Sequence, residues 1–200
     1  SHIKRLMSEW VGRIVAKDKD TTPELINGRY YTDAPVNLFQ FIHQQIDIAV
    51  DTSYLQLLVE VVKECICVLF SYQAMLNRVL KENWKVLSFN YVLAVVNNSS
   101  KSGDLTVILS DKVTKMLRDP WKSEVDMSPI LAGFASLCSA GLVTLANIIF
   151  VDLCPALDVV FKTKWLAQED PVVDVVLETL EDYFENNLEP FLSDVLYREM

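Results

Sequence analysis

The side chains that could carry chemistry in this sequence are few, and they do not converge. His43 is the one histidine besides the terminal His2. A catalytic base or a metal ligand needs partners at short spacing, and neither a suitably spaced cysteine nor a set of carboxylates accompanies His43. On an expected helix it borders the apolar side that carries Phe39 and Ile46, which favours a half-buried structural histidine.

The four cysteines are too few for a disulfide scaffold in 200 residues. Cys65 and Cys67 lie two apart on an expected helix, so they point in different directions and suit neither a redox pair nor a metal pair. The sequence contains no Gly-rich phosphate loop, nucleophile elbow or His-Glu-x-x-His motif. We therefore predict a protein that is not an enzyme, with no cofactor and no bound metal, whose cysteines are buried free thiols.

Carboxylates gather on one expected helix near the C-terminal end. Spacings of mostly three and four residues place them on its polar side: Asp174, Glu178, Glu181, Asp182 and Glu185. Such a face is usually a solvated helix surface, and its alternative interpretation is a docking strip for a basic protein partner. The whole chain is acidic too, with 18 Lys and Arg against 27 Asp and Glu. That balance disfavours nucleic acid and anionic lipid as partners of the whole surface, and it leaves a local basic patch open.

The elements that must position these residues are predicted to be helical nearly throughout. Apolar residues recur at three- and four-residue spacing over 3–17, 35–51, 53–83, 86–96, 105–117, 128–153 and from 171 onward, with a last helix from 190. No strand is expected, and 18–27 is predicted to be a polar linker ending in the turn signal Asn27-Gly28. Thr32 or Asp33 is expected to cap the second helix, and Pro155 to end the helix that begins at Ser128.

Residues 127–151 carry no charge and are long enough to cross a membrane. Their start has the capping pattern of a soluble helix, and acidic rather than basic residues flank them. A stripe of small residues at four-residue steps would let another helix approach closely: Ala132, Ser136, Ala140 and Thr144. We therefore expect a buried central helix and no transmembrane segment.

On the acidic helix, the residues expected to face inward are Val172, Val173, Val176, Leu177, Leu180, Tyr183 and Phe184.

The fold class predicted from these patterns is all-α, as an elongated antiparallel bundle or stacked bundles. We expect residues 1–27 to be the end of a preceding helix and a linker, and 28–200 to be the bundle domain. The chain is expected to be a fragment of a longer protein. The composition of residues 97–103 predicts a loop.

An ordered series of residues resembles a known family. It consists of Trp10, Gly28, Tyr30, Thr32, Val36, Leu38, Phe39, Gln44 and Gln45, followed by short matches at 70–73, 95–98, 104–105, 149–152 and 181–184. The series resembles the C-terminal helical region of the exocyst component-three family, whose members are tethering subunits of secretory vesicles. That family tends to run one long helix through the place of 97–103, so helix and loop both stay open there.

The resemblance implies a rod-like tethering fold and a non-enzymatic role, holding a secretory vesicle at the plasma membrane before SNARE-mediated fusion. It implies other exocyst subunits and SNARE-type fusion machinery as partners, with a small GTPase as a further candidate. The expected location is cytoplasmic, peripheral at plasma-membrane sites of exocytosis. The M-Sec branch shares the fold and is an alternative within the family. The alternative outside it is a helical adaptor in membrane remodelling or small-GTPase signalling.

Overall fold

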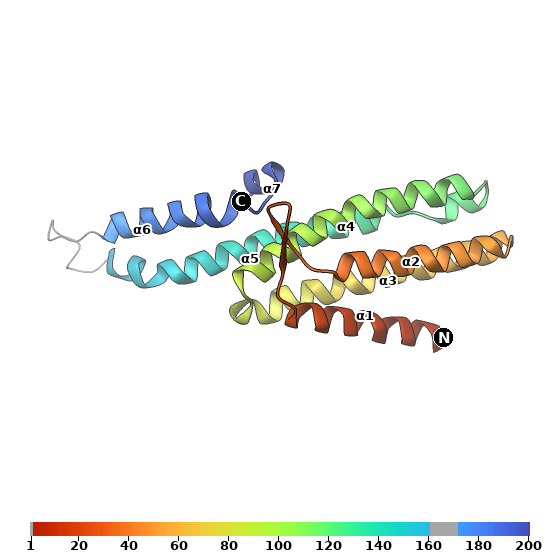
Figure 1. The fold of residues 1–200 in the computed structure, drawn as a ribbon, viewed down its shortest axis with the longest axis horizontal. Helices are drawn as coiled ribbons and strands as arrows, with labels where there is room; N and C mark the ends of the chain where they lie inside the picture. Colours follow the sequence, from red (N-terminus) through yellow and green to blue (C-terminus); the bar gives the residue numbers. More distant parts are fainter. Residues whose placement is uncertain (1, 161–171) are drawn as a thin grey trace.

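The computed structural model describes residues 2–160 and 172–200 and shows an elongated bundle of helices crossed by one small hairpin (Figure 1). In chain order the elements are α1 (His2–Asp20), β1 (Glu24–Ile26), β2 (Arg29–Tyr31), α2 (Ala34–Asp51), α3 (Leu55–Asn83), the 3-10 turn η1 (Trp84–Val86), α4 (Phe89–Met116), the 3-10 turn η2 (Trp121–Glu124), α5 (Ser128–Val160), α6 (Val172–Glu181), the π-helical η4 (Asp182–Leu188) and α7 (Asp194–Arg198). The predicted all-α, elongated bundle is confirmed.

The spine of the bundle is the antiparallel pair α4 and α5, which share the most extensive contact (Figure 1). α3 packs against both α5 and α1, while α2 lies on α3 and α4. Strand β2 rests on α4, so the hairpin crosses the spine near its middle. α6 runs back along the second half of α5 and extends the rod at that end.

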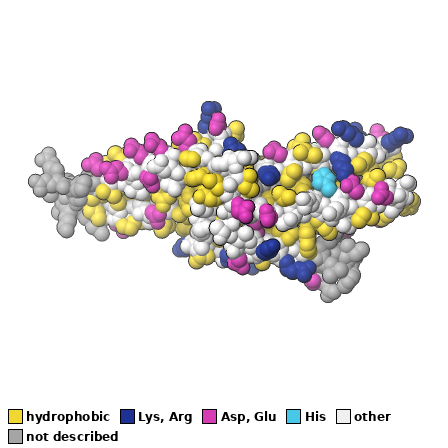
Figure 2. Space-filling model, in the orientation of Figure 1, with side chains coloured by type: hydrophobic (Ala, Val, Ile, Leu, Met, Phe, Trp, Pro, Cys, Tyr) yellow, Lys and Arg dark blue, Asp and Glu magenta, His cyan; other side chains and the backbone are white. Residues whose placement is uncertain are grey.

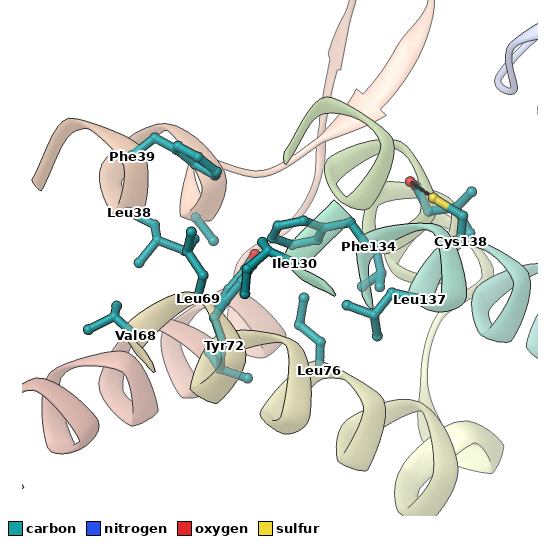
Figure 3. Close-up of a cluster of buried hydrophobic side chains, with 14 of the residues drawn as sticks. Leu38, Phe39, Val68, Leu69, Tyr72, Leu76, Ile130, Phe134, Leu137 and Cys138 are labelled. Atoms are coloured by element: carbon teal, nitrogen blue, oxygen red, sulfur yellow. Dashed lines mark hydrogen bonds between the residues drawn. The ribbon is translucent and has the colours of Figure 1, made fainter. Parts of the chain in front are cut away.

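Apolar side chains of α2, α3 and α5 meet in the core of the rod (Figure 3). Leu38, Leu69 and Ile130 are completely excluded from solvent. The rings of Tyr72 and Phe134 lie 6.5 Å apart between centroids and tilted by 57°. Because burying one such side chain is worth about 1.5–3 kcal/mol, this contact of three helices is a major source of stability.

Neighbouring helices approach closely at two glycines of α5. A Cβ added at Gly133 would lie 2.3 Å from Oε1 of Gln73, whose Nε2 donates to the Ile130 carbonyl at 2.7 Å. A Cβ added at Gly141 would lie 2.4 Å from Cγ2 of Val96.

The small-residue stripe predicted for this helix is therefore largely wrong. Ala132 and Ser136 are exposed, Ala140 is half-buried, and Thr144 alone is buried. The close approach depends on Gly133 and Gly141, which lie on another side of α5, facing α3 and α4.

Helix α4 runs without a break through 97–103, the stretch that composition alone assigns to a loop. Four polar side chains of this stretch are buried: Asn97, Asn98, Ser99 and Ser102. The Ser102 hydroxyl has no hydrogen-bond partner among the described residues, whereas the two asparagines bind other segments. Nδ2 of Asn97 donates to the carbonyls of Tyr30 and Phe191 at 3.1 and 3.0 Å. Nδ2 of Asn98 donates to Oγ1 of Thr32 at 2.7 Å. The two asparagines are polar because they bind other segments of the chain, and the helical alternative suggested by the family resemblance is correct.

The hairpin was not expected, and it corrects the prediction of a strand-free linker. Glu24 pairs with Tyr31 and Ile26 with Arg29 in an antiparallel register. Asn27 and Gly28 form the turn with φ of 50° and 79°, the left-handed conformation that an Asn-Gly hairpin turn requires. The turn signal in the sequence was correct, but strands of three residues are too short for an alternating pattern to reveal.

Two further boundaries differ from prediction. Pro155 lies inside α5, which continues to Val160. Its side chain is exposed, so its ring points away from the core. The final helix begins later than residue 190, at the cap formed by Ser193, whose Oγ accepts from the Leu196 amide. At α2, Asp33 occupies the cap position without a capping hydrogen bond from its side chain. The other predicted cap residue, Thr32, accepts a hydrogen bond from Asn98.

The segment 121–159, which contains nearly all of α5, is long and apolar enough to cross a membrane by length and composition alone. In the bundle, however, its side chains Ile130, Phe134 and Leu145 are buried against α3 and α4. One side of α5 thus packs in the core of the bundle, as the prediction of a central helix requires, while Val143, Phe150 and Val151 on its other side are exposed.

The contact at Gly141 gives a direct test of this packing. Gly141→Ala should lower the free energy of unfolding by about 1–3 kcal/mol, because Val96 is fully buried and its branched side chain cannot turn aside. The measurement is the urea midpoint at unchanged slope.

Gly103→Ala is the matched control, since it also lies within a helix and nothing stands within 4 Å of its added Cβ. It should stabilise the protein by about 0.5–1 kcal/mol. Equal midpoints for the two variants would show that α4 and α5 do not meet closely at Gly141.

Candidate protein-binding surface

The predicted acidic residues all lie on the solvent side of α6 and η4, where acidic side chains gather along one edge of the rod (Figure 2). We call them the acidic strip: Asp174, Glu178, Glu181, Asp182 and Glu185. Residues 172–188 contain no Lys or Arg. Among the described residues none of the five forms an ion pair, so the strip presents negative charge to solvent.

The strip is not a single α-helical face, because α6 changes to π geometry at Asp182. The amide of Glu189 donates to the Phe184 carbonyl at 2.9 Å, a step of five residues. The Asp182 carboxylate accepts from Nδ2 of Asn186 at 2.9 Å and Nδ2 of Asn187 at 3.3 Å. Asp182 is thereby held in place by its own turn, whereas the other four carboxylates make no hydrogen bond among the described residues.

Aromatic residues on the inward side of η4 hold the acidic strip against the rest of the bundle. The ring of Tyr183 lies 5.5 Å from that of Phe89, and its hydroxyl donates to the Asp152 carboxylate on α5. Burial, that hydrogen bond and the charge of Asp152 raise the pKa of Tyr183 to about 12, so the donor persists at physiological pH. Phe184 packs against Tyr197 of α7. These contacts fix η4 against three other helices.

The apolar residues predicted to face inward from α6 are only partly correct. Val172, Val176, Leu180, Tyr183 and Phe184 are half-buried. Val173 and Leu177, in contrast, are 46% and 52% exposed beside the acidic strip. On the neighbouring α5, Phe150 is 60% exposed. The surface therefore combines apolar and acidic side chains, and helical periodicity could not reveal this because it does not distinguish core from exposed apolar residues.

His43 is half-buried on α2, as expected. Burial and the nearby positive charge of Lys112 lower its pKa, while Asp47 acts in the opposite direction. Lys112 donates to the Asp47 carboxylate at 2.5 Å, which ties α4 to α2 beside the imidazole. Within the described residues no group of His, Cys, Asp and Glu is arranged to hold a metal ion.

The cysteines are free thiols, but the prediction that they are buried is correct only for Cys65 and Cys138, since Cys67 and Cys154 are exposed. Burial raises the pKa of Cys65 to about 12 and that of Cys138 to about 11, so neither is a thiolate at physiological pH. The Cys138 thiol instead donates to the Val96 carbonyl at 3.6 Å (Figure 3).

Asp18 is a titratable group whose burial was not predicted from the sequence. Predicted to lie in a linker, it is on α1, 4% exposed, and accepts from the Tyr91 hydroxyl at 3.4 Å. Burial raises its pKa, while hydrogen bonds from Thr32 and Tyr91 act against that rise. The nearby charge of Asp33 adds to the increase.

The sign of this shift makes a pH-dependent prediction. Because the pKa of Asp18 is higher in the folded state, folding favours its protonated form, and this contribution is lost as pH rises through the folded pKa. Asp18→Asn should therefore gain stability relative to the parent protein as pH is raised from 4 to 7. Urea unfolding across that range would measure the difference, with exposed Asp20→Asn reporting the general effect of removing one negative charge. A difference that stays constant with pH would contradict the assignment.

Three comparisons place this fold among known proteins. A family model described as exocyst complex component Sec6 matches residues 1–200. The exocyst complex component SEC6 of Saccharomyces cerevisiae is 22% identical over 223 residues, covering 96% of this chain and 27% of that protein. The crystal structure of the C-terminal domain of the exocyst subunit Sec6p matches with a TM-score of 0.86 at 21% identity, covering 98% of this chain and 56% of that one. The chain thus spans about a quarter of its curated relative.

Proposed function

Because the chain belongs to the exocyst complex component Sec6 family, we propose that it is the helical part of an exocyst subunit that tethers secretory vesicles to the plasma membrane before SNARE-mediated fusion. The observation that carries this proposal is the family match over residues 1–200. Assignment to the component-three branch, rather than to M-Sec-like proteins, is part of the proposal.

The mechanism is mechanical rather than catalytic: a stiff rod displays protein-binding surfaces at fixed separations. α4 has 28 residues and so measures about 42 Å at 1.5 Å per residue. Its antiparallel contact with α5, which is closest packed at Gly141, holds the two helices side by side. The subunit would act in the cytoplasm, peripherally at plasma-membrane sites of exocytosis.

The partners in this proposal are other exocyst subunits and the SNARE-type fusion machinery, with a small GTPase as a further candidate. The acidic strip would receive a basic surface of one of them. Exposed Val173 and Leu177 would add apolar contact beside it, as in interfaces with an apolar centre and a polar rim. Complementary charge would mainly speed and orient association.

Affinity purification of the full-length protein, followed by identification of the stable partners, tests the function. Recovery of the other exocyst subunits in comparable amounts is the expected result. A preparation that contains a small GTPase or membrane-remodelling proteins but no exocyst subunit would instead support the adaptor or M-Sec-like alternatives. A bait lacking residues 172–200 would show whether the region of the acidic strip contributes to that recovery.

Reversal of charge tests the strip itself. Glu178→Lys combined with Glu181→Lys should slow association with the partner subunit at low salt, and the effect should shrink at high salt because exposed charges are screened over about 8 Å at physiological ionic strength. The fold should survive, since exposed charges change stability by about 1 kcal/mol or less. Stopped-flow association rates at the two salt concentrations provide the measurement.

Asp51→Lys combined with Glu60→Lys is the matched control, because both residues are exposed and lie on α2 and α3, away from the strip. It makes the same change in net charge. If the two double variants slow association equally, the effect comes from net charge and the strip is only a solvated face.

A further inference from the structure

A second surface feature is built from different elements: a cleft of about 360 Å³ between the hairpin, α4 and the start of α7. Figure 1 shows the hairpin crossing α4 with its turn close to α7. Arg29 and Tyr31 line the cleft from β2, Lys101 and Asp104 from α4, and Ser193 from the C-terminal side. Arg29 and Tyr31 lie two apart on one strand and therefore point to the same side of the hairpin.

This cleft carries two positively charged side chains without ion-pair partners among the described residues, although the molecule as a whole is acidic. Arg29 and Lys101 are half-buried, yet neither forms an ion pair among the described residues. Nζ of Lys101 lies 5.1 Å from the centroid of the Tyr31 ring, a contact that holds the ammonium without neutralising it. Asp104 is the only acidic residue lining the cleft, and it is exposed. A chain of net charge −9 thus keeps two partly desolvated cations facing one small polar cleft.

We propose that this cleft binds an acidic segment of a partner protein, with a side-chain carboxylate received between Arg29 and Lys101. A carboxylate would pair with the guanidinium of Arg29 in its fork geometry and with the ammonium of Lys101 as a point charge. Polar groups such as Ser193 can hydrogen-bond the segment's backbone, and the volume suits a few extended residues.

A peptide suits this cleft better than a membrane surface does. An anionic bilayer would have to approach the whole face of an acidic molecule, and the long-range repulsion would oppose it. A short acidic segment enters the cleft alone, so it meets the two cations without bringing a sheet of negative charge against the rest of the rod. Asp104 leaves the cleft with only one excess positive charge, which matches a single carboxylate.

The test uses the purified 200-residue chain and a fluorescein-labelled heptapeptide of alternating aspartate and serine, followed by fluorescence anisotropy. Its neutral counterpart of alternating asparagine and serine should bind much more weakly. Arg29→Gln combined with Lys101→Gln should weaken binding of the acidic peptide by about tenfold or more. Asp104→Asn should strengthen it by about two- to fivefold, because it removes the one repelling carboxylate.

Lys115→Gln combined with Arg118→Gln is the matched control, since it removes two exposed cations near the end of α4, outside the cleft. It should change binding by less than about twofold. Circular dichroism melts would show whether each variant remains folded. Absence of peptide binding at millimolar concentration, equal losses in the two double variants, or binding only to vesicles of phosphatidylserine and phosphatidylcholine would each overturn the proposal.

Discussion

Two neighbouring amides on α4 hold together segments that are far apart in the sequence. Asn97 donates both of its amide hydrogens, one to the hairpin at Tyr30 and one to the C-terminal segment at Phe191, while Asn98 binds Thr32 just before α2. An amide that is buried without hydrogen-bond partners costs free energy. The hairpin, the C-terminal segment and Thr32 must therefore all be in place for these two amides to be satisfied. The unbroken course of α4, the position of the hairpin and the path of the chain into α7 all depend on this junction.

The same junction explains which parts of the fold were predictable. Apolar periodicity located α2 and α3 within a few residues, because their packing residues recur along one helix face. It could not decide 97–103, where polar residues have partners 66 to 94 positions away. The resemblance to a family helped there, since Tyr30, Thr32 and the Asn pair belong to the matching series. Pro155 was predicted to end its helix because proline generally disfavours a helix interior. In the structure it lies on an exposed face of α5, and the helix continues past it.

The surfaces were predictable to different degrees. The exposure of the acidic strip followed from charge alone, because ionised side chains are rarely buried without a partner. The exposure of Val173 and Leu177 could not be predicted, since apolar periodicity does not show how much of a helix face the neighbouring elements will cover. The cleft could not be predicted from the sequence either, because Arg29, Lys101 and Ser193 become neighbours only when the hairpin and α7 pack on α4.

The long antiparallel contact of α4 with α5 has a consequence for mechanical load. A force pulling these helices apart along the rod axis would act on all of their contacts at once, in shear, so many side chains would have to slide past one another together. A force perpendicular to the axis would instead peel the contacts one after another. An interdigitated, close-packed surface such as the one at Gly141 resists the first far better than the second. The bundle is therefore mechanically anisotropic, strongest along its own length.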